Sequence, residues 1–431
     1  MMSAPNYSKY LTREAAARKP SPIRALMPLL KVPGMISLGA GLPNPATFPI
    51  SGMRFDVSDP TCSSGEGSME LELSPDEVSA ALQYSETKGM PVLVEQLASL
   101  MERTHGENVS EVEVERALAV TTGSQDGLTK AFASILGEGD SLLVEDPTYS
   151  GALAYLQPAG VDMVPIPVDG EGLDPDSLAR VLDEWPEEKP KPKALYTIVT
   201  GQNPSGATTP LERKEAIYQL ACQHDFLILE DDPYYFLTHD GHDPAPSFLS
   251  IDSGSRTLRF DSLSKVFSSG IRIGWVTGPE PLVQAIILHA QATSLHSSGL
   301  SQALVAKILQ SWGPPAFDAH IASVRSFYSQ RAQAFEQAAQ RHLSGLAEWS
   351  TPTAGMFFWF KISGIEDSFA LIKEKALEAK VLLVPGSAFS PLGLPSPYVR
   401  ASFSVADPDL YDEALSRLAT LIRDAHASQS Q

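Results

Sequence analysis

The sequence predicts an α/β protein with a doubly wound, mostly parallel sheet and a smaller α+β domain. Between about residues 117 and 292, short apolar runs alternate with helical stretches. This alternation is typical of strands that are buried on both faces with helices between them. The chain has 431 residues, enough for two domains, and its hydrophobic content of 43% is ordinary for a globular protein.

Seven apolar runs are predicted to be the strands of the large sheet. They cover residues 118–121, 141–145, 163–168, 194–199, 226–230, 257–260 and 271–277. Helical stretches near 125–136, 211–224 and 280–293 separate several of them. Ligands of such sheets bind at the carboxyl ends of the strands, so the polar residues that follow these runs are the candidate site.

We expect three parts along the chain. Residues 1–76 form an N-terminal segment that belongs partly to the small domain, and 57–76, rich in Ser, Gly, Pro and acids, is predicted to be a mobile acidic loop. Residues 77–315 form the large domain. Residues 316–431 form the small domain, with a long helix over 316–343 and strands near 356–362, 381–385 and 398–403.

The composition argues against several classes of partner. A net charge of −20 disfavours nucleic acid and an anionic membrane surface. No apolar run approaches the ~20 residues that span a bilayer. Cys62 and Cys222 form no metal spacing or disulfide framework, which indicates a reducing compartment. Residues 1–24 are basic but lack the long arginine-dense stretch of a mitochondrial presequence, so the cytoplasm is expected.

The most informative stretch runs from Asp261 to Lys265, with Arg272 seven residues further on. A lysine attacks a carbonyl only when its amine is deprotonated, which desolvation or a neighbouring cation favours. Ser262, Ser264 and Arg272 offer hydroxyls and a guanidinium to a phosphate. Pyridoxal 5'-phosphate (PLP) carries both an aldehyde and a phosphate, so the stretch is a candidate PLP site. A surface lysine after a strand is the alternative.

Three adjacent acids, Glu230, Asp231 and Asp232, follow another predicted strand. A carboxylate there could pair with the protonated pyridine nitrogen of PLP and keep the ring able to accept electrons. A divalent-metal site is the alternative, but no histidine or carboxylate at a suitable spacing completes a ligand set, so no metal is expected. His239 and His242 are predicted to be solvated.

Four further residues stand at strand or helix ends. Ser124 begins a helix whose free N–H groups could seat a phosphate. Asn203 could donate to a phenolate oxygen, and Tyr149 could stack on a flat ring. Arg400 interrupts an apolar strand and suits a substrate α-carboxylate. Each residue also has an alternative explanation. Ser124 could simply cap the helix, and Asn203 could form a turn. Tyr149 could be a core aromatic residue, and Arg400 a surface arginine.

With these motifs in this order, the chain resembles the fold-type I PLP enzymes, specifically the class I/II aminotransferases. Within that family it is most similar to the kynurenine/2-aminoadipate and fungal aromatic aminotransferase subgroup. The likeness covers nearly the whole chain and includes residues 16–24, 36–45, 81–85, 353–357 and 400–404.

The resemblance implies a role for each candidate position. Lys265 would hold PLP as an aldimine and shuttle the proton, and Asp231 would pair with the pyridine nitrogen. By the same resemblance, Tyr234 and Asn203 would contact the phenolic oxygen and Tyr149 the ring, while the phosphate would be bound by Ser124, Gln125, Ser262, Ser264 and Arg272. Tyr84 would bind the phosphate of the neighbouring subunit. Arg400 and Asn203 would bind the α-carboxylate of the substrate, and Gly41 and Arg24 would belong to a segment that closes over the substrate. The role of Tyr84 implies a homodimer.

The resemblance further implies transfer of an amino group from an aromatic, kynurenine or 2-aminoadipate type L-amino acid to a 2-oxo acid such as 2-oxoglutarate, by a ping-pong mechanism. A PLP-dependent lyase that breaks a C–S bond by β-elimination stays open, because the shared machinery stops at the carbanion. A PLP-sensing regulatory module is disfavoured, since the match begins too near the start of the chain for a preceding helix-turn-helix and the charge is acidic.

Overall fold

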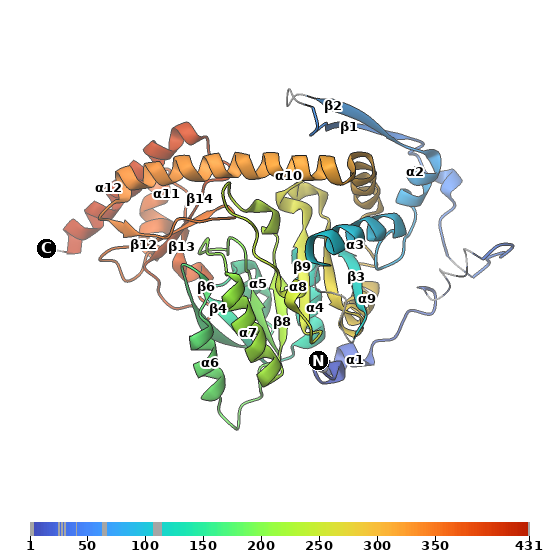
Figure 1. Cartoon of the computed structure of the whole chain (residues 1–431), viewed down its shortest axis with the longest axis horizontal. Coiled ribbons are helices and arrows are strands. Elements are labelled where there is room, and N and C mark those ends of the chain that lie inside the picture. Colours follow the sequence, from blue (N-terminus) through green and yellow to red (C-terminus); the bar gives the residue numbers. More distant parts are fainter. Residues whose placement is uncertain are drawn as a thin grey trace. The chain divides into compact units, whose positions relative to one another are not determined.

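The computed structural model describes residues 4–429 except for 25, 27–28, 30–31, 40, 63–66 and 107–113. The chain divides into two compact units. The first unit comprises residues 1–137 and 248–323, and the second comprises 138–247 and 324–431. Figure 1 shows their helices and strands coloured along the sequence. The predicted domains, with boundaries at 76 and 315, divide the chain differently and remain a prediction.

Three of the predicted strands belong to the first unit: β3 (Arg116–Thr121), β9 (Thr257–Ser262) and β10 (Gly274–Pro279). Their order is β3-β10-β9, and both pairings are antiparallel. Helices α3 (Pro91–His105), α4 (Ser124–Ile135) and α9 (Glu280–Thr293) pack on these strands. Every side chain of β9 is buried, including an ion pair between Arg259 and Asp261 with 2.9 Å from Nη2 to Oδ1. The end of β9 is therefore held by a satisfied pair of charges.

The N-terminal elements of the first unit are short. They are η1 (Tyr7–Lys9), α1 (Arg13–Ala17), η3 (Pro45–Thr47) and α2 (Pro75–Leu82). Thr12 caps α1 by accepting the Ala15 N–H, and α1 packs on α4 and α9. The Tyr7 hydroxyl donates to the Ser255 carbonyl oxygen over 2.7 Å, which ties the start of the chain to this unit.

The segment 57–76, predicted to be a mobile loop, is largely ordered secondary structure, and that prediction was wrong. β1 (Met53–Ser58) and β2 (Ser68–Leu73) form an antiparallel hairpin, and α2 follows at once (Figure 1). Exposed and less exposed residues alternate along both strands. Two of the acids that suggested a loop, Glu70 and Glu72, lie at exposed positions of β2, so the alternation of residues with a period of two predicted this segment better than its composition did. Residues 63–66 lie outside the described part.

The second unit contains five strands: β4 (Ser141–Asp146), β5 (Asp162–Asp169), β6 (Gly172–Leu173), β7 (Ala194–Thr197) and β8 (Leu227–Asp231). Their order is β8-β7-β4-β5-β6, parallel except for β5 with β6. The connecting helices are α5 (Ser150–Leu156), α6 (Pro175–Asp183) and α7 (Leu211–His224). All seven predicted strands are present in the two units, and the α/β fold is confirmed. The short β6 was not predicted.

A separate antiparallel sheet lies in the C-terminal part of the second unit. It contains β11 (Ala347–Glu348), β12 (Phe357–Ile362), β13 (Val384–Pro385) and β14 (Tyr398–Ser402), in the order β11-β12-β14-β13. Phe335 of the long helix α10 (Gly299–Leu343) and helix α12 (Tyr411–Gln429) share a hydrophobic core with it. α10 is interrupted at Gly313, where φ is 60° and two prolines follow.

The remaining elements are single turns or short helices. They are η5 (Tyr235–Leu237), α8 (Phe248–Ile251), η6 (Leu263–Lys265), η7 (Ser269–Ile271), η8 (Leu371–Lys375), α11 (Ala376–Glu378), η9 (Gly386–Phe389) and η10 (Pro408–Leu410). Within the described ranges, no helix is both long and apolar enough to cross a membrane.

Candidate active site

The first unit contains an anion seat at the start of α4. Gly123 precedes Ser124, and no side-chain hydrogen bond caps this helix, whose start carries the positive end of the helix dipole and so favours an anion. The Arg272 guanidinium lies beside the helix start, with Nη2 donating to the Thr122 carbonyl oxygen over 3.0 Å. Gly123 has a φ of +81°, and a Cβ built there would lie 2.2 Å from Arg272 Nη2. Only glycine allows the arginine to approach this closely.

Two serines complete the seat. Ser262 accepts the Ser264 N–H over 3.2 Å and donates to the Ser264 hydroxyl over 3.0 Å. Arg272 Nη1 donates to the same Ser264 hydroxyl over 3.1 Å. The structure thus places three predicted phosphate ligands in one hydrogen-bonded group. Gln125 is the second residue of α4 and is partly buried.

A second glycine, which the sequence analysis did not single out, brings the two halves of this seat together. A Cβ at Gly274 would lie 2.7 Å from the Ser124 nitrogen and 2.7 Å from the Asp261 carbonyl oxygen. Gly274 therefore lets the start of α4 approach the end of β9. The need for glycine at positions 123 and 274 becomes evident only when the strand pairing shows which groups approach them.

Lys265 closes η6, directly after Ser264, and is partly buried. The turn that follows is anchored by an aromatic group. His320 Nε2 lies 2.6 Å from the Val266 carbonyl oxygen, and Phe267 packs edge-on against both Trp312 and His320. The lysine is therefore carried on a turn with restricted movement.

The second unit places Asp231 at the end of β8, where its side chain is buried. Tyr196 of the neighbouring strand β7 donates its hydroxyl to Asp231 Oδ2 over 3.0 Å. Burial, and then the Asp231 carboxylate, raise the pKa of Tyr196, so the phenol stays protonated and remains a donor. Sequence reasoning missed Tyr196, because an inward tyrosine on a strand resembles a core residue.

Arg400 and Asn203 meet in the second unit. Arg400 Nη1 donates to Asn203 Oδ1 over 2.9 Å. The guanidinium carbon lies 4.6 Å from the Phe357 ring centroid and 5.0 Å from that of Phe389. Burial lowers the pKa of Arg400, and in the described part of the chain Nε is buried without a hydrogen-bond partner and no carboxylate forms an ion pair with the guanidinium. A partly buried guanidinium in this state is suited to an anionic ligand.

Two tyrosines lie in the same unit. Tyr234 is buried and hydrogen-bonded to Asn203. Burial, and then the nearby Asp231 carboxylate, raise its pKa, so it is a donor at neutral pH. The Tyr149 ring lies over Gly151, where a Cβ would be 2.4 Å from the ring. Because Gly151 has no side chain, the Tyr149 ring can take this position.

A buried carboxyl group supports the loop that carries Asn203. Gln202 Nε2 donates to Glu145 Oε2 over 3.0 Å and to the Pro147 carbonyl oxygen over 2.8 Å. Glu145 also accepts the Thr197 hydroxyl over 2.6 Å. Its side chain is fully buried, and burial raises its pKa to about 7. The sequence analysis did not identify this network.

The three N-terminal candidates lie in the first unit. Arg24 Nη1 donates to the Ser85 carbonyl oxygen over 2.9 Å, and its guanidinium carbon lies 5.5 Å from the Tyr84 ring centroid. Tyr84 is 47% exposed. Gly41 is exposed, and no atom lies within 4 Å of a Cβ built there. The structure therefore brings Arg24 and Tyr84 together and leaves Gly41 open.

The histidine prediction was half wrong. His239 is buried, with Nδ1 3.0 Å from the Pro352 carbonyl oxygen and Nε2 3.3 Å from that of Gly355. The backbone at 352–355 covers it, which no local pattern revealed. His242 is exposed, as expected. Among the described residues, no group of three or more His, Cys, Asp or Glu side chains could hold a metal ion.

The first unit thus contains a helix start, an arginine and a lysine close to one another, and the second unit contains a buried carboxylate and a guanidinium without a carboxylate partner among the described residues. The chain belongs to the aminotransferase class I and II family, whose model matches residues 69–418. It is a PLP-dependent aminotransferase of fold type I, as the sequence motifs implied.

Individual relatives cover nearly the whole chain. The chain is 44% identical to the mitochondrial kynurenine/alpha-aminoadipate aminotransferase of Bos taurus, over 97% of this chain and 100% of the relative. It is 37% identical to the aminotransferase tdiD of Emericella nidulans, over 94% and 93%. The crystal structure of the aminotransferase Aro8 from Candida albicans matches with a TM-score of 0.89 and 29% identity, over 98% of this chain and 99% of that one.

Proposed function

We propose that this aminotransferase takes its amino group from an aromatic, kynurenine or 2-aminoadipate type L-amino acid and passes it to a 2-oxo acid such as 2-oxoglutarate. The observation that carries the proposal is the partly buried Arg400 guanidinium, which has no carboxylate partner among the described residues and whose buried Nε has no hydrogen-bond partner there. Amino acids and 2-oxo acids share the α-carboxylate that would fill this place. The names of the relatives support the donor class.

The residue roles are part of the proposal. When bound, PLP supplies an aldehyde that condenses with amines and a ring that accepts electron density from the α-carbon. In the first unit, Lys265 would hold the cofactor, and the phosphate would be bound by Ser124, Gln125, Ser262, Ser264 and Arg272. The hydrogen-bonded seat around Arg272 and the uncapped α4 fit such a dianion.

The second unit would bind the ring and the substrate. Asp231, oriented by the Tyr196 hydroxyl, would pair with the pyridine nitrogen, and a buried carboxylate favours a cationic partner. Tyr234 and Asn203 would hydrogen-bond the phenolic oxygen, and Tyr149 would stack on the ring. Arg400 and Asn203 would bind the α-carboxylate.

Lys265 would also move the proton. Its Nζ would accept the α-proton of the amino acid and later release it, which a primary amine can do only when deprotonated. Arg272 is hydrogen-bonded to Ser264, the residue before Lys265. Arg24 and Gly41, on the exposed N-terminal segment, would contribute to closure over the substrate.

The assay that tests the reaction uses purified holoenzyme with tyrosine, kynurenine, 2-aminoadipate and a cysteine S-conjugate, each with and without 2-oxoglutarate. Glutamate formed only with the acceptor supports the proposal and ranks the donors, and Lys265→Ala should abolish it. Ammonia and thiol released without an acceptor would instead support the lyase. The relatives reported above are all named as aminotransferases, which favours transfer.

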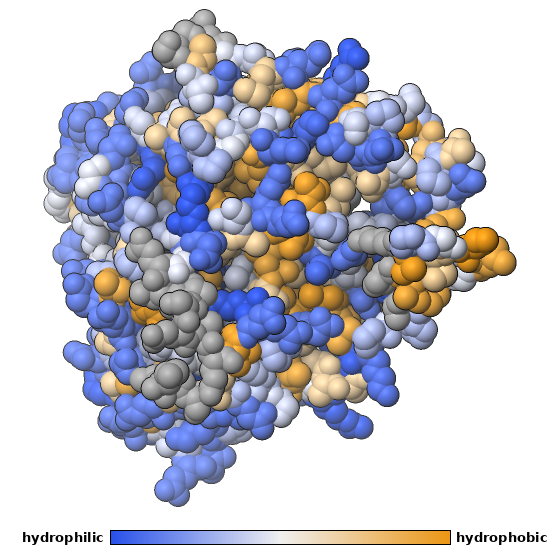
Figure 2. All heavy atoms as spheres, turned by 45° about the vertical axis from the view of Figure 1, so that its right-hand side comes forward, coloured by the Kyte–Doolittle hydropathy of each residue, from blue (hydrophilic) through white to orange (hydrophobic). Residues whose placement is uncertain are grey.

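We also propose a homodimer in which Tyr84 serves the phosphate of the neighbouring subunit. Tyr84 is half exposed, and apolar residues of the same unit are strongly exposed, with Ile36 at 86% and Leu38 at 98%. Apolar (orange) residues are visible on the face of the molecule shown in Figure 2. Exposed apolar surface of this kind is typical of an interface between subunits.

A mixed dimer tests the role of Tyr84. Tyr84→Ala and Lys265→Ala enzymes are each expected to be impaired. If Tyr84 acts on the neighbouring subunit, a dimer with one chain of each kind has one complete site and regains about half of the specific activity. No recovery above the parent enzymes would show that Tyr84 acts within its own chain.

We propose the cytoplasm as the compartment. The mammalian relatives are named as mitochondrial, so cell fractionation is the deciding experiment. Recovery with a matrix marker enzyme would replace the cytoplasmic assignment.

A further inference from the structure

A cavity of about 520 Å³ lies wholly within the second unit. Its size is in the range of small-molecule sites, roughly 300–1,000 Å³. Its walls include the aromatic side chains of Trp349, Trp359 and Tyr398. None of the residues proposed above to bind PLP or the α-carboxylate lines it. The cavity is therefore separate from the proposed site and has no role in the proposed reaction.

The aromatic walls are held in place. The Trp359 and Tyr398 rings stack with centroids 5.1 Å apart and planes at 7°. Trp349 donates from Nε1 to Glu336 Oε2 over 3.1 Å and packs edge-on against Phe360. Rigid aromatic walls lose little entropy when a ligand binds to them.

The charges around the cavity are mainly negative. Asp146, Asp169 and Glu348 line it, with Lys361 as the basic residue. Glu348 Oε2 lies 3.9 Å from the Lys361 ammonium, so these two charges offset each other.

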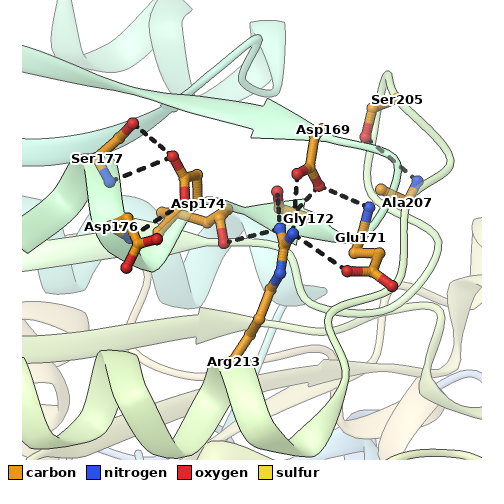
Figure 3. A network of polar contacts seen from close by, with 10 residues as sticks. Asp169, Glu171, Gly172, Asp174, Asp176, Ser177, Ser205, Ala207 and Arg213 are labelled. Carbon is orange, nitrogen blue, oxygen red and sulfur yellow. Dashed lines mark hydrogen bonds and ion pairs between the residues drawn. The ribbon is translucent and has the colours of Figure 1, made fainter.

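Asp169 is also neutralised. As Figure 3 shows, Arg213 points at the turn after β5 and donates to both Asp169 oxygens, over 2.7 and 2.8 Å. The same guanidinium lies 3.1 Å from Glu171.

Asp146 is the carboxylate that remains. It is partly buried, and in the described part of the chain its side chain makes no hydrogen bond or ion pair that would satisfy it. Burial raises its pKa, because a carboxylate that is partly removed from water is less stable in its charged form. A cationic ligand in the cavity would offset that charge.

We propose that this cavity is a binding site for an organic cation, a substituted ammonium ion with an aromatic or alkyl body. The ammonium group would lie next to Asp146, and the body would contact Trp349, Trp359 and Tyr398. Carboxylates and aromatic rings together are the usual means by which proteins recognise such ions.

We further infer that binding alters the affinity of the enzyme for its amino acid, an inference that rests on the proposed role of Arg400. Trp359 packs edge-on against Phe389 at 5.6 Å, and Phe389 lies 5.0 Å from the Arg400 guanidinium carbon. Pro147 also lines the cavity, and its carbonyl oxygen accepts from Gln202, the residue before Asn203. One residue, Phe389 or Gln202, thus lies between each proposed carboxylate ligand and a wall of the cavity.

Benzyltrimethylammonium is a suitable probe for titration calorimetry of the holoenzyme. It has no N–H with which to condense with PLP and no carboxylate for Arg400. We expect one saturable site per chain. The neutral isostere neopentylbenzene should bind at least about tenfold more weakly, because it lacks the charge that pairs with Asp146.

Two variants test the walls. Asp146→Asn should weaken probe binding about tenfold or more, and Trp349→Leu about three- to thirtyfold, the range of a cation–π contact. Asp183→Asn makes the same chemical change at an exposed position on α6 outside the cavity and should leave binding unchanged. Retained PLP absorbance would show that each variant is folded. Absence of saturable binding, or equal affinity in the wild type and Asp146→Asn, would overturn the site.

Kinetics test the coupling. Saturating probe should change the KM for the amino acid at least about twofold in the wild type and leave Asp146→Asn unchanged. Saturable binding without a change in KM would overturn the coupling to Arg400. If Arg400→Ala itself leaves KM unaltered, the proposed role of Arg400 fails, whereas the calorimetric result for the cavity is unaffected.

Discussion

Arg400 donates from Nη1 to Oδ1 of Asn203 over 2.9 Å, although 197 residues separate the two in the sequence. The contact joins β14 to the loop after β7, both in the second unit. It holds one side of the guanidinium and leaves the buried Nε to a ligand. We therefore expect the two residues to act together in binding a carboxylate.

Replacement of Arg400 tests this role. Arg400→Ala should lower kcat/KM for both the amino acid and the 2-oxo acid about 100-fold, because loss of a partner from a buried charge pair costs about 3 kcal/mol. Arg423→Ala, on an exposed part of α12, is the matched control and should behave as the wild type. An unchanged KM for every amino acid tested would remove Arg400 from the substrate site.

Tyr196 is expected to act through Asp231. Tyr196→Phe removes the donor to a charged acceptor, a contact worth about 1.5–3 kcal/mol, so kcat should fall at least about tenfold. In an Asp231→Asn background the same change should have little further effect, because the charged acceptor is gone. A double-mutant cycle on kcat, with the cofactor absorbance followed against pH, measures the coupling. Additive losses would show that Tyr196 acts independently of Asp231.

Gly123 should be required for binding of the PLP phosphate. Gly123→Ala places a Cβ 2.2 Å from Arg272 Nη2, so the arginine must move. The affinity of apoenzyme for PLP should fall about tenfold or more, the value of a charge-assisted contact. Gly139→Ala is the control, since Gly139 has a similar φ of +80° and no atom within 4 Å of its Cβ. It should lower thermal stability through backbone strain and leave PLP affinity intact. Equal losses of PLP affinity in Gly123→Ala and Gly139→Ala would contradict the explanation by a clash with Arg272.

Glu145 should make stability depend on pH. Burial raises its pKa from 4.5 to about 7, so the native state binds this proton more tightly than the unfolded chain does. The sign follows: the stabilising effect of the proton is fully present below about pH 4.5 and is lost as pH rises toward 7. Glu145→Gln cannot ionise, so its melting temperature relative to the wild type should increase between pH 5 and pH 8. Parallel profiles for the two proteins over that range would show that Glu145 does not titrate there.

Much of the site lies in segments that the sequence itself identified. Ser262, Ser264, Lys265 and Arg272 come from one short stretch, and a turn between two strands keeps such residues together whatever the rest of the chain does. Asp231 was recognised because it follows an apolar run directly, and a strand end is a local property. Proposing these positions required only the periodicity of the apolar residues, the expected burial of the strands and the chemistry of the residues that follow them.

Other features were decided by strand order and by contacts between distant segments. Tyr196 faces Asp231 because β7 and β8 are neighbours, and His239 is buried because the backbone near residue 354 covers it. The hairpin of β1 and β2 was predicted to be a loop because that prediction relied on the composition of the segment and not on its alternation with a period of two, which was the correct indication of strands. In each case the deciding partner lies outside the few residues that a local pattern describes.

The sequence by itself determined the α/β class and the family and provided the candidate residues for PLP, because motif chemistry and periodicity are carried by neighbours along the chain. Tertiary structure alone decided the pairing of Arg400 with Asn203, the support of Asp231 by Tyr196 and the cavity beside Asp146. Those depend on which strands lie side by side and which side chains remain unsatisfied after packing, and both are set only when the chain has folded.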